Sequence, residues 1–183
     1  MIIYIHGFGG SGNGSKAKLF REYFKSNNKN FIAPSLSYVP NLAISTLKEL
    51  IESYNEDVYL IGSSLGGYYS IYLTTVLSDI VKKTILINPA VNPTTTLNRA
   101  IGKSENFYDN SYYEWNQNHL KMLEEYKKTD LKNYKDKFML LSQKGDELLD
   151  YKEATNLLSG SKQIVENNGN HSFEGIERYF DEK

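Results

Sequence analysis

A short motif rich in glycine and serine carries the clearest chemical signal in the sequence. Residues 62–66 read Gly-Ser-Ser-Leu-Gly, which matches G-x-S-x-G with Ser64 at its centre. An apolar run at 57–62 precedes the motif and a helix-like segment at 65–78 follows it. In this setting the motif forms a nucleophile elbow, a sharp strand-to-helix turn that exposes the serine hydroxyl at the end of the strand. The pattern predicts that Ser64 is a nucleophile.

A purely structural interpretation of the same motif also exists. Serine is a favoured N-cap, so Ser64 could simply cap a helix that begins at Leu65. The nucleophile interpretation additionally explains Gly62 and Gly66, because the positions that flank a sharp turn must be almost free of side chain. Ser63 fills a variable position of the motif.

A second glycine-rich segment follows the first apolar run. Residues 6–12 read His-Gly-Phe-Gly-Gly-Ser-Gly. Acyl transfer needs two N–H donors aimed at the oxyanion that develops on the carbonyl oxygen. The elbow supplies the N–H of Leu65, and a loop after a strand supplies the second, which we assign to Phe8. His6 is expected to anchor this loop through hydrogen bonds.

The same loop also matches two nucleotide-binding patterns. Residues 7–12 fit G-x-G-x-x-G, but a dinucleotide site needs an acidic residue about 20 positions later, and residues 30–38 contain no carboxylate. A P-loop would need Gly-Lys followed by Ser or Thr, whereas residues 15–17 read Ser-Lys-Ala. These departures favour the oxyanion interpretation and leave nucleotide binding as an alternative.

Chain order points to the partners of Ser64. In this kind of site the acid follows the serine and the histidine follows the acid, which selects His171 over His119. Three carboxylates compete for the acid in residues 145–150, Gly-Asp-Glu-Leu-Leu-Asp. Asp150 has the position of a helix N-cap, with Glu153 at the capping-box position. Glu147 is expected to face solvent. Asp146 lies nearest the end of the preceding apolar run and is the predicted acid.

The elements that must position these residues alternate between strands and helices. Most of the strands are continuous apolar runs, as is typical of strands buried on both faces. The pattern predicts an α/β fold with a mostly parallel, doubly wound sheet and three layers. The six expected strands are 2–6, 30–35, 57–62, 83–88, 137–142 and 162–166, and the expected helices are 15–26, 42–54, 65–78, 151–158 and 173–181.

One segment interrupts this alternation. Residues 92–136 separate two strands by far more than a normal crossover, and a long structureless loop is uncommon inside a compact domain. We therefore expect a helical cap inserted into one domain that spans 1–183. Its acidic and basic side chains are equal in number, so its net charge indicates no anionic substrate. Its many aromatic side chains could line an acyl pocket or form a small core of the cap itself.

Composition narrows the function classes. The chain has 183 residues, a net charge of −1 and 23% charged residues, so no basic field favours nucleic acid. It has no cysteine and three histidines, which removes thiolate chemistry and disfavours a histidine-rich metal site. No apolar stretch approaches the roughly 18 residues of a membrane helix, and the first residues do not resemble a signal peptide. We expect a cytoplasmic protein without metal or organic cofactor.

Taken together, these motifs resemble the small bacterial YqiA/YcfP-type esterases of the α/β-hydrolase fold. The matching segments are spread over nearly the whole chain in the expected order: His6-Gly7-Phe8, residues 62–69, Asn88-Pro89-Ala90-Val91, Gly145-Asp146-Glu147 with Leu149-Asp150-Tyr151, and Gly169-Asn170-His171-Ser172-Phe173. The resemblance implies a serine esterase or thioesterase with Ser64, Asp146 and His171 as its triad. It is weakest in the cap.

The predicted reaction is hydrolysis of a small acyl ester or thioester through an acyl-enzyme intermediate. Three alternatives remain at this point. The same residues could transfer the acyl group to an acceptor other than water. The glycine loop could bind a nucleotide, or the chain could be a catalytically idle binding module. The sequence indicates neither the acyl chain nor the oligomeric state.

Overall fold

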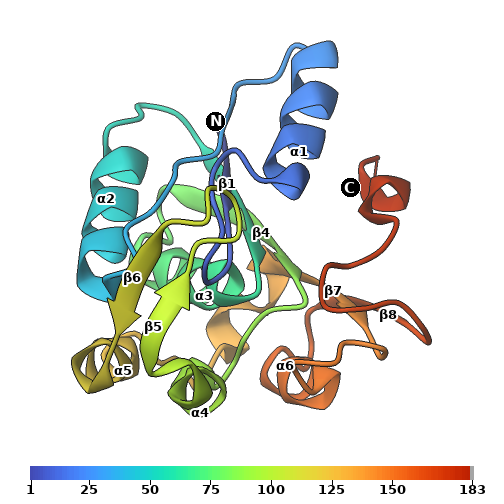
Figure 1. Cartoon of the computed structure of the whole chain (residues 1–183). Helices are drawn as coiled ribbons and strands as arrows, with labels where there is room; N and C mark the ends of the chain where they lie inside the picture. Colours follow the sequence, from blue (N-terminus) through green and yellow to red (C-terminus); the bar gives the residue numbers. More distant parts are fainter. Residues whose placement is uncertain (182–183) are drawn as a thin grey trace.

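The computed structural model describes residues 1–181, and a parallel sheet forms its centre. The strand order is β2-β1-β3-β4-β7-β8, and every neighbouring pair is parallel. The α/β fold and its mostly parallel sheet of six strands are thus confirmed (Figure 1). The strands are β1 (Ile2–Ile5), β2 (Phe31–Ile32), β3 (Val58–Ser63), β4 (Val81–Ile87), β7 (Phe138–Gln143) and β8 (Lys162–Glu166).

Helices cover both faces of the sheet, as the continuous apolar strands predict. Alternate residues of β1 show this division: Ile3 and Ile5 pack with α2 (Pro40–Glu52) and α3 (Leu65–Val76), whereas Tyr4 packs with α1 (Ser15–Ser26). The helix α6 (Tyr151–Leu157) packs on β4 and β7 through Ala154. The observed boundaries of these four helices differ from the expected ones by two residues or fewer. Among the strands, β2 differs most, because only two of its six expected residues are paired.

Residues 92–136 form a mixed insertion, so the expectation of a helical cap is only partly right. Short helices are present, but residues 102–115 form an antiparallel hairpin in which Gly102 pairs with Trp115. Trp115 is fully buried and joins the main core, which explains why this aromatic stretch forms a strand anchored on the body of the protein. The elements are α4 (Pro93–Thr96), η1 (Leu97–Ala100), β5 (Gly102–Glu105), β6 (Tyr112–Trp115), α5 (Gln117–Glu124) and η2 (Lys132–Lys137).

The expected helix at 173–181 is wrong. Only a single 3₁₀ turn, η3 (Ile176–Tyr179), forms there. Phe173 and Gly175 have φ angles of 59° and 73°, in the left-handed region, and this geometry prevents a continuous α-helix. The segment still closes one face of the sheet, because Phe173 and Ile176 are buried against it.

Parallel strands place their carboxyl ends at one edge of the sheet, and the loops that follow β1, β3, β7 and β8 carry all of the predicted site residues. Among the helices of residues 1–181, none is both long enough and apolar enough to cross a bilayer.

Candidate active site

Ser64 stands on a strained turn between β3 and α3. Its φ and ψ angles are 55° and −122°, a conformation that non-glycine residues rarely adopt. Its side chain makes no capping hydrogen bond to the helix, so the structure does not support the N-cap interpretation. The backbone holds the turn from both sides: the Ser64 N–H donates to the Ile87 carbonyl (3.1 Å), and the Ala90 N–H donates to the Ser64 carbonyl (3.0 Å).

The glycines of the motif are required by close packing. A Cβ on Gly66 would lie 2.0 Å from the Ile5 carbonyl oxygen, and one on Gly62 would lie 2.6 Å from the Gly66 carbonyl oxygen. These contacts are with backbone, which a flexible side chain cannot relieve. The α3 helix therefore presses directly on the end of β1, and this packing sets the height of Ser64 above the sheet edge.

Three side chains from distant parts of the chain form one hydrogen-bonded line. The Ser64 Oγ lies 3.0 Å from His171 Nε2, and His171 Nδ1 lies 2.9 Å from Asp146 Oδ2. The Asp146 side chain is only 3% exposed, whereas that of His171 is 20% exposed. This geometry suits an imidazole that donates from Nδ1 to a buried carboxylate and accepts the serine hydroxyl at Nε2.

The competing carboxylates lie elsewhere. Asp150 caps α6 by accepting a hydrogen bond from the Lys152 N–H (2.9 Å), as predicted. Glu153 instead accepts from the Asn92 side chain. Glu147 is exposed, but its carboxylate accepts the His171 backbone N–H (3.0 Å), and this bond lowers the pKa of Glu147. It therefore fixes the histidine's main chain, not its ring.

Two buried amides that sequence reasoning gave no role hold the His171 loop. Asn88 follows β4 and donates to the carbonyls of Asn170 (2.9 Å) and His171 (3.1 Å). Gln143 ends β7, and its Oε1 accepts the N–H groups of Asn170 (3.0 Å) and Glu174 (2.9 Å). The signal for both was available, since each is a polar residue at the carboxyl end of an apolar strand.

Lys16 adds a third hold from the first turn of α1. Its ammonium donates to the Ser172 carbonyl, next to His171, and lies near enough to Asp146 for their charges to interact. Burial lowers the pKa of Lys16 to about 8, although the attraction of Asp146 opposes this. The sequence offered no signal for this contact, because it depends on how α1 packs across the sheet edge.

Two backbone N–H groups close to the serine are free to bind an oxyanion. Among residues 1–181, the N–H groups of Phe8 and Leu65 donate to no acceptor. Both residues line the same cavity as Ser64. A Cβ on Gly7 would lie 3.0 Å from the Ser64 Cβ, so the loop reaches the serine only because this position is glycine. Two free donors beside the serine are compatible with the predicted oxyanion hole, which stays a prediction.

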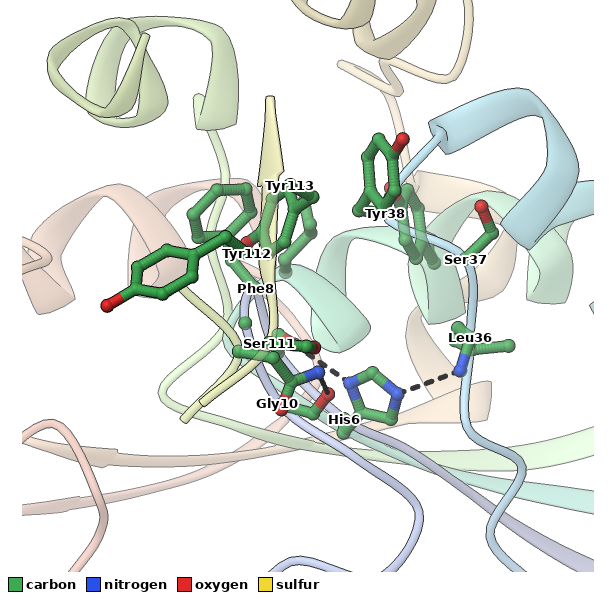
Figure 2. Close-up of a pocket in the computed structure, with 14 residues that line it drawn as sticks. His6, Phe8, Gly10, Leu36, Ser37, Tyr38, Ser111, Tyr112 and Tyr113 are labelled. Atoms are coloured by element: carbon green, nitrogen blue, oxygen red, sulfur yellow. Dashed lines mark hydrogen bonds between the residues drawn. The ribbon is translucent and has the colours of Figure 1, made fainter. Parts of the chain in front are cut away.

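His6 anchors the glycine loop through hydrogen bonds of its ring, as expected. Its Nε2 accepts the Leu36 N–H (3.0 Å) and its Nδ1 lies 2.8 Å from the Gly7 carbonyl oxygen, as Figure 2 shows. Burial lowers the pKa of His6, which favours the neutral ring. His119 lies in α5, where it pairs with Asn116 in a capping box. Neither ring contacts Ser64.

The serine opens into a cavity of about 800 Å³, here called the large cavity. Its walls include His171 and Lys16 from the body, and Arg99 and Phe107 from the insertion. The volume lies within the range of small-molecule sites. In the described part of the chain no group of three or more His, Asp or Glu side chains is arranged to hold a metal ion.

The glycine loop is packed against the protein's own chain. A Cβ on Gly12 would lie 2.1 Å from the Ala33 carbonyl oxygen, and Gly9 lies against the Phe107 ring. These two glycines are therefore explained by contacts within the chain, and a bound phosphate is not needed to account for them.

Comparison with solved structures supports the fold. Alpha/beta hydrolase domain-containing protein 10 from mouse superposes with a TM-score of 0.75 at 18% identity, covering 93% of this chain and 81% of that one. A monoacylglycerol lipase from Paleococcus ferrophilus superposes with a TM-score of 0.67 at 16% identity, covering 93% and 85%. The chain thus has the α/β-hydrolase fold.

Sequence comparison identifies the family. A UPF0227 protein from Vibrio vulnificus (strain CMCP6) is 25% identical over 184 residues, covering 98% of this chain and 94% of its own. A UPF0227 protein from Vibrio cholerae (strain O395) is 27% identical over 113 residues, and that alignment spans 62% of the relative's length. The profile of the Uncharacterised protein family UPF0227 matches residues 1–182. The chain is therefore a member of the UPF0227 family.

Proposed function

We propose that the protein is a serine hydrolase that cleaves acyl esters or thioesters through an acyl-enzyme. The observation that carries this proposal is the line of hydrogen bonds from Ser64 Oγ through His171 to Asp146. The proposal is further supported by the α/β-hydrolase fold, since one structural neighbour is described as a monoacylglycerol lipase. A fold alone does not define a reaction, so the proposal depends on the geometry of the site residues.

The first step acylates Ser64. His171 Nε2 takes the hydroxyl proton while Ser64 Oγ attacks the substrate carbonyl carbon, and the resulting imidazolium is stabilised by Asp146. The tetrahedral oxyanion accepts hydrogen bonds from the N–H groups of Phe8 and Leu65. When the intermediate collapses, the bond to the leaving oxygen or sulfur breaks, and His171 returns the proton to that atom.

The second step restores the enzyme. A water molecule enters beside His171, which takes one of its protons as the oxygen attacks the acyl carbonyl. The same two N–H groups hold the second oxyanion. Collapse releases the carboxylic acid, and the proton on His171 returns to Ser64 Oγ. No cofactor takes part in the proposed steps.

The two adjacent serines provide a matched test of the nucleophile. Ser64→Ala is expected to lower turnover of a chromogenic acetyl ester by on the order of 10⁶-fold, as loss of a triad serine does elsewhere. Ser63→Ala removes the same atom from a neighbouring buried residue and should keep most of the activity. Thermal unfolding of both variants checks that the fold persists. Loss of activity in Ser63→Ala with retention in Ser64→Ala would refute the assignment.

The two aspartates can be separated by different measurements. Asp146→Asn is expected to lower turnover by on the order of 10⁴-fold, because an amide cannot enforce the required imidazole tautomer. Asp150→Ala should instead lower the free energy of unfolding by about 1 kcal/mol through the lost cap, with turnover nearly unchanged. Steady-state kinetics and urea denaturation of both variants distinguish these roles, and exchanged outcomes would move the acid to Asp150.

Lys16 should reveal its burial in the pH dependence of stability. The pKa of the Lys16 ammonium falls to about 8 in the folded protein. Above that pH the folded protein loses the ammonium proton while the unfolded chain still keeps it, so the folded state gains stability as the pH rises. The free energy of unfolding of the wild type, minus that of Lys16→Met, should therefore increase between pH 7 and pH 9.5. Urea titrations at several pH values measure this difference. A constant difference would show that the Lys16 ammonium is fully solvated.

A further inference from the structure

A second, smaller cavity of about 300 Å³ is lined in part by the His6 loop, residues 6–10. We call it the tyrosine cavity, because Tyr69 lines it together with Tyr38, Tyr112 and Tyr113, the three tyrosines that Figure 2 labels. It shares His6, Gly7, Gly10 and the predicted oxyanion residues Phe8 and Leu65 with the large cavity. Neither Ser64 nor His171 is among its lining residues. The two cavities therefore meet at the oxyanion position and differ in their access to the histidine.

The tyrosine cavity is suited to an uncharged group. No Asp, Glu, Lys or Arg is among the described residues that line it. Its only imidazole, His6, has both ring nitrogens engaged with the backbone, and burial favours its neutral form. By contrast, Lys16, Arg99 and Glu147 line the large cavity. An ion placed in the tyrosine cavity would lose its hydration without gaining an opposite charge.

Two tyrosines that line this cavity have phenol hydroxyls that make no hydrogen bond within residues 1–181. The Tyr113 hydroxyl is buried and unpaired. Tyr69 is only 3% exposed, and among residues 1–181 its hydroxyl also takes part in no hydrogen bond. The adjacent Tyr68 is different, since its hydroxyl donates to the Leu123 carbonyl (2.6 Å). An unpaired buried hydroxyl such as that of Tyr113 is rare in folded proteins, and a ligand oxygen is one way to satisfy it.

These hydroxyls remain protonated at neutral pH. Burial raises the pKa of Tyr113 to about 12 and raises that of Tyr69 further above its ordinary value. Each can therefore donate one hydrogen bond and accept another. A ligand hydroxyl, which also does both, is a matching partner.

Aromatic rings define the shape of the tyrosine cavity. Tyr38 and Tyr113 are stacked, with ring centroids 4.6 Å apart and an angle of 19° between planes. Phe8 meets Tyr113 edge-on at 5.8 Å. Such surfaces favour another ring, which can stack or pack by its edge. The volume is about twice the roughly 150 Å³ cavity that holds benzene in a well-studied case, so one substituted ring fits.

The position of His171 decides which half of the substrate enters. The leaving atom must receive its proton from His171, so the leaving group extends into the large cavity, which His171 lines. The acyl carbonyl oxygen points to Phe8 and Leu65, which are among the residues that line both cavities. The acyl group then continues into the tyrosine cavity.

We propose that the tyrosine cavity is the acyl subsite, and that it selects a single-ring aromatic acyl group bearing a hydroxyl that hydrogen-bonds Tyr69 and Tyr113. This inference rests on the proposed function for the identity of the acyl half. It goes beyond it by naming the class of acyl group and the two residues that recognise it.

The test compares 4-nitrophenyl esters of 4-hydroxybenzoate, benzoate and acetate. The quantity of interest is the kcat/KM ratio of the hydroxylated to the plain aryl ester, measured in each protein, because comparing proteins cancels the intrinsic reactivity of the esters. Tyr69→Phe and Tyr113→Phe should each lower this ratio by about two- to tenfold, the worth of one net neutral hydrogen bond. The acetate ester, which has no ring, reports whether the triad of each variant still works.

Tyr72→Phe is the matched control. Tyr72 lies one turn after Tyr69 on α3, is partly buried and does not line the tyrosine cavity. Its removal should leave the ratio as in the wild type. A ratio that is equal in the wild type, Tyr69→Phe and Tyr113→Phe would overturn the subsite while the proposed function stands.

A binding experiment separates failure of the subsite from failure of the proposed function. Calorimetry with Ser64→Ala protein should show tighter binding of 4-hydroxybenzamide than of benzamide, and the additional change Tyr69→Phe should remove the difference. If no ester is hydrolysed, the proposed function fails, and this comparison alone decides the subsite. Equal affinity of the two amides would overturn it.

Discussion

The strained backbone of Ser64 is the constraint on which the site depends. A non-glycine residue at φ 55° carries a cost of about 1–3 kcal/mol, which the surrounding structure must offset. Backbone hydrogen bonds to β4 and to Ala90 hold the turn. At Gly66 the start of α3 packs so closely on the end of β1 that a side chain there would clash with the β1 backbone. The same turn carries both Ser64 and Leu65, and both residues line the large cavity.

In the proposed mechanism Ser64 needs a base at a fixed distance, and two buried amide side chains at the sheet edge hold that base in place. Asn88 and Gln143 extend from the ends of two neighbouring strands and bind the backbone around His171. Their side chains replace the regular secondary structure that this loop lacks. The ring of His171 is thus aligned between Ser64 and Asp146 by rigid elements, as preorganised catalysis requires.

Much of this organisation could be predicted from sequence, since it follows from local patterns. Apolar runs gave the six strands, the glycines around Ser64 marked the elbow, and the Asp150 cap was predicted because its pattern is local. The hairpin 102–115 was missed, because its strands are stabilised by burying Trp115 on the body of the protein. The helix expected at 173–181 does not form, because two residues in this segment have positive φ angles. The contact of Lys16 with Ser172 could not be predicted, because it depends on tertiary packing.

The central claim is that His171 activates Ser64, and covalent labelling with a fluorophosphonate tests it most directly. Intact-mass analysis should show one adduct per chain, and peptide mapping should place it on Ser64. His171→Ala should abolish rapid labelling, whereas His119→Ala, which changes a histidine in the capping box of α5, should label at the wild-type rate. Rapid labelling of His171→Ala, or an adduct on another residue, would contradict the account.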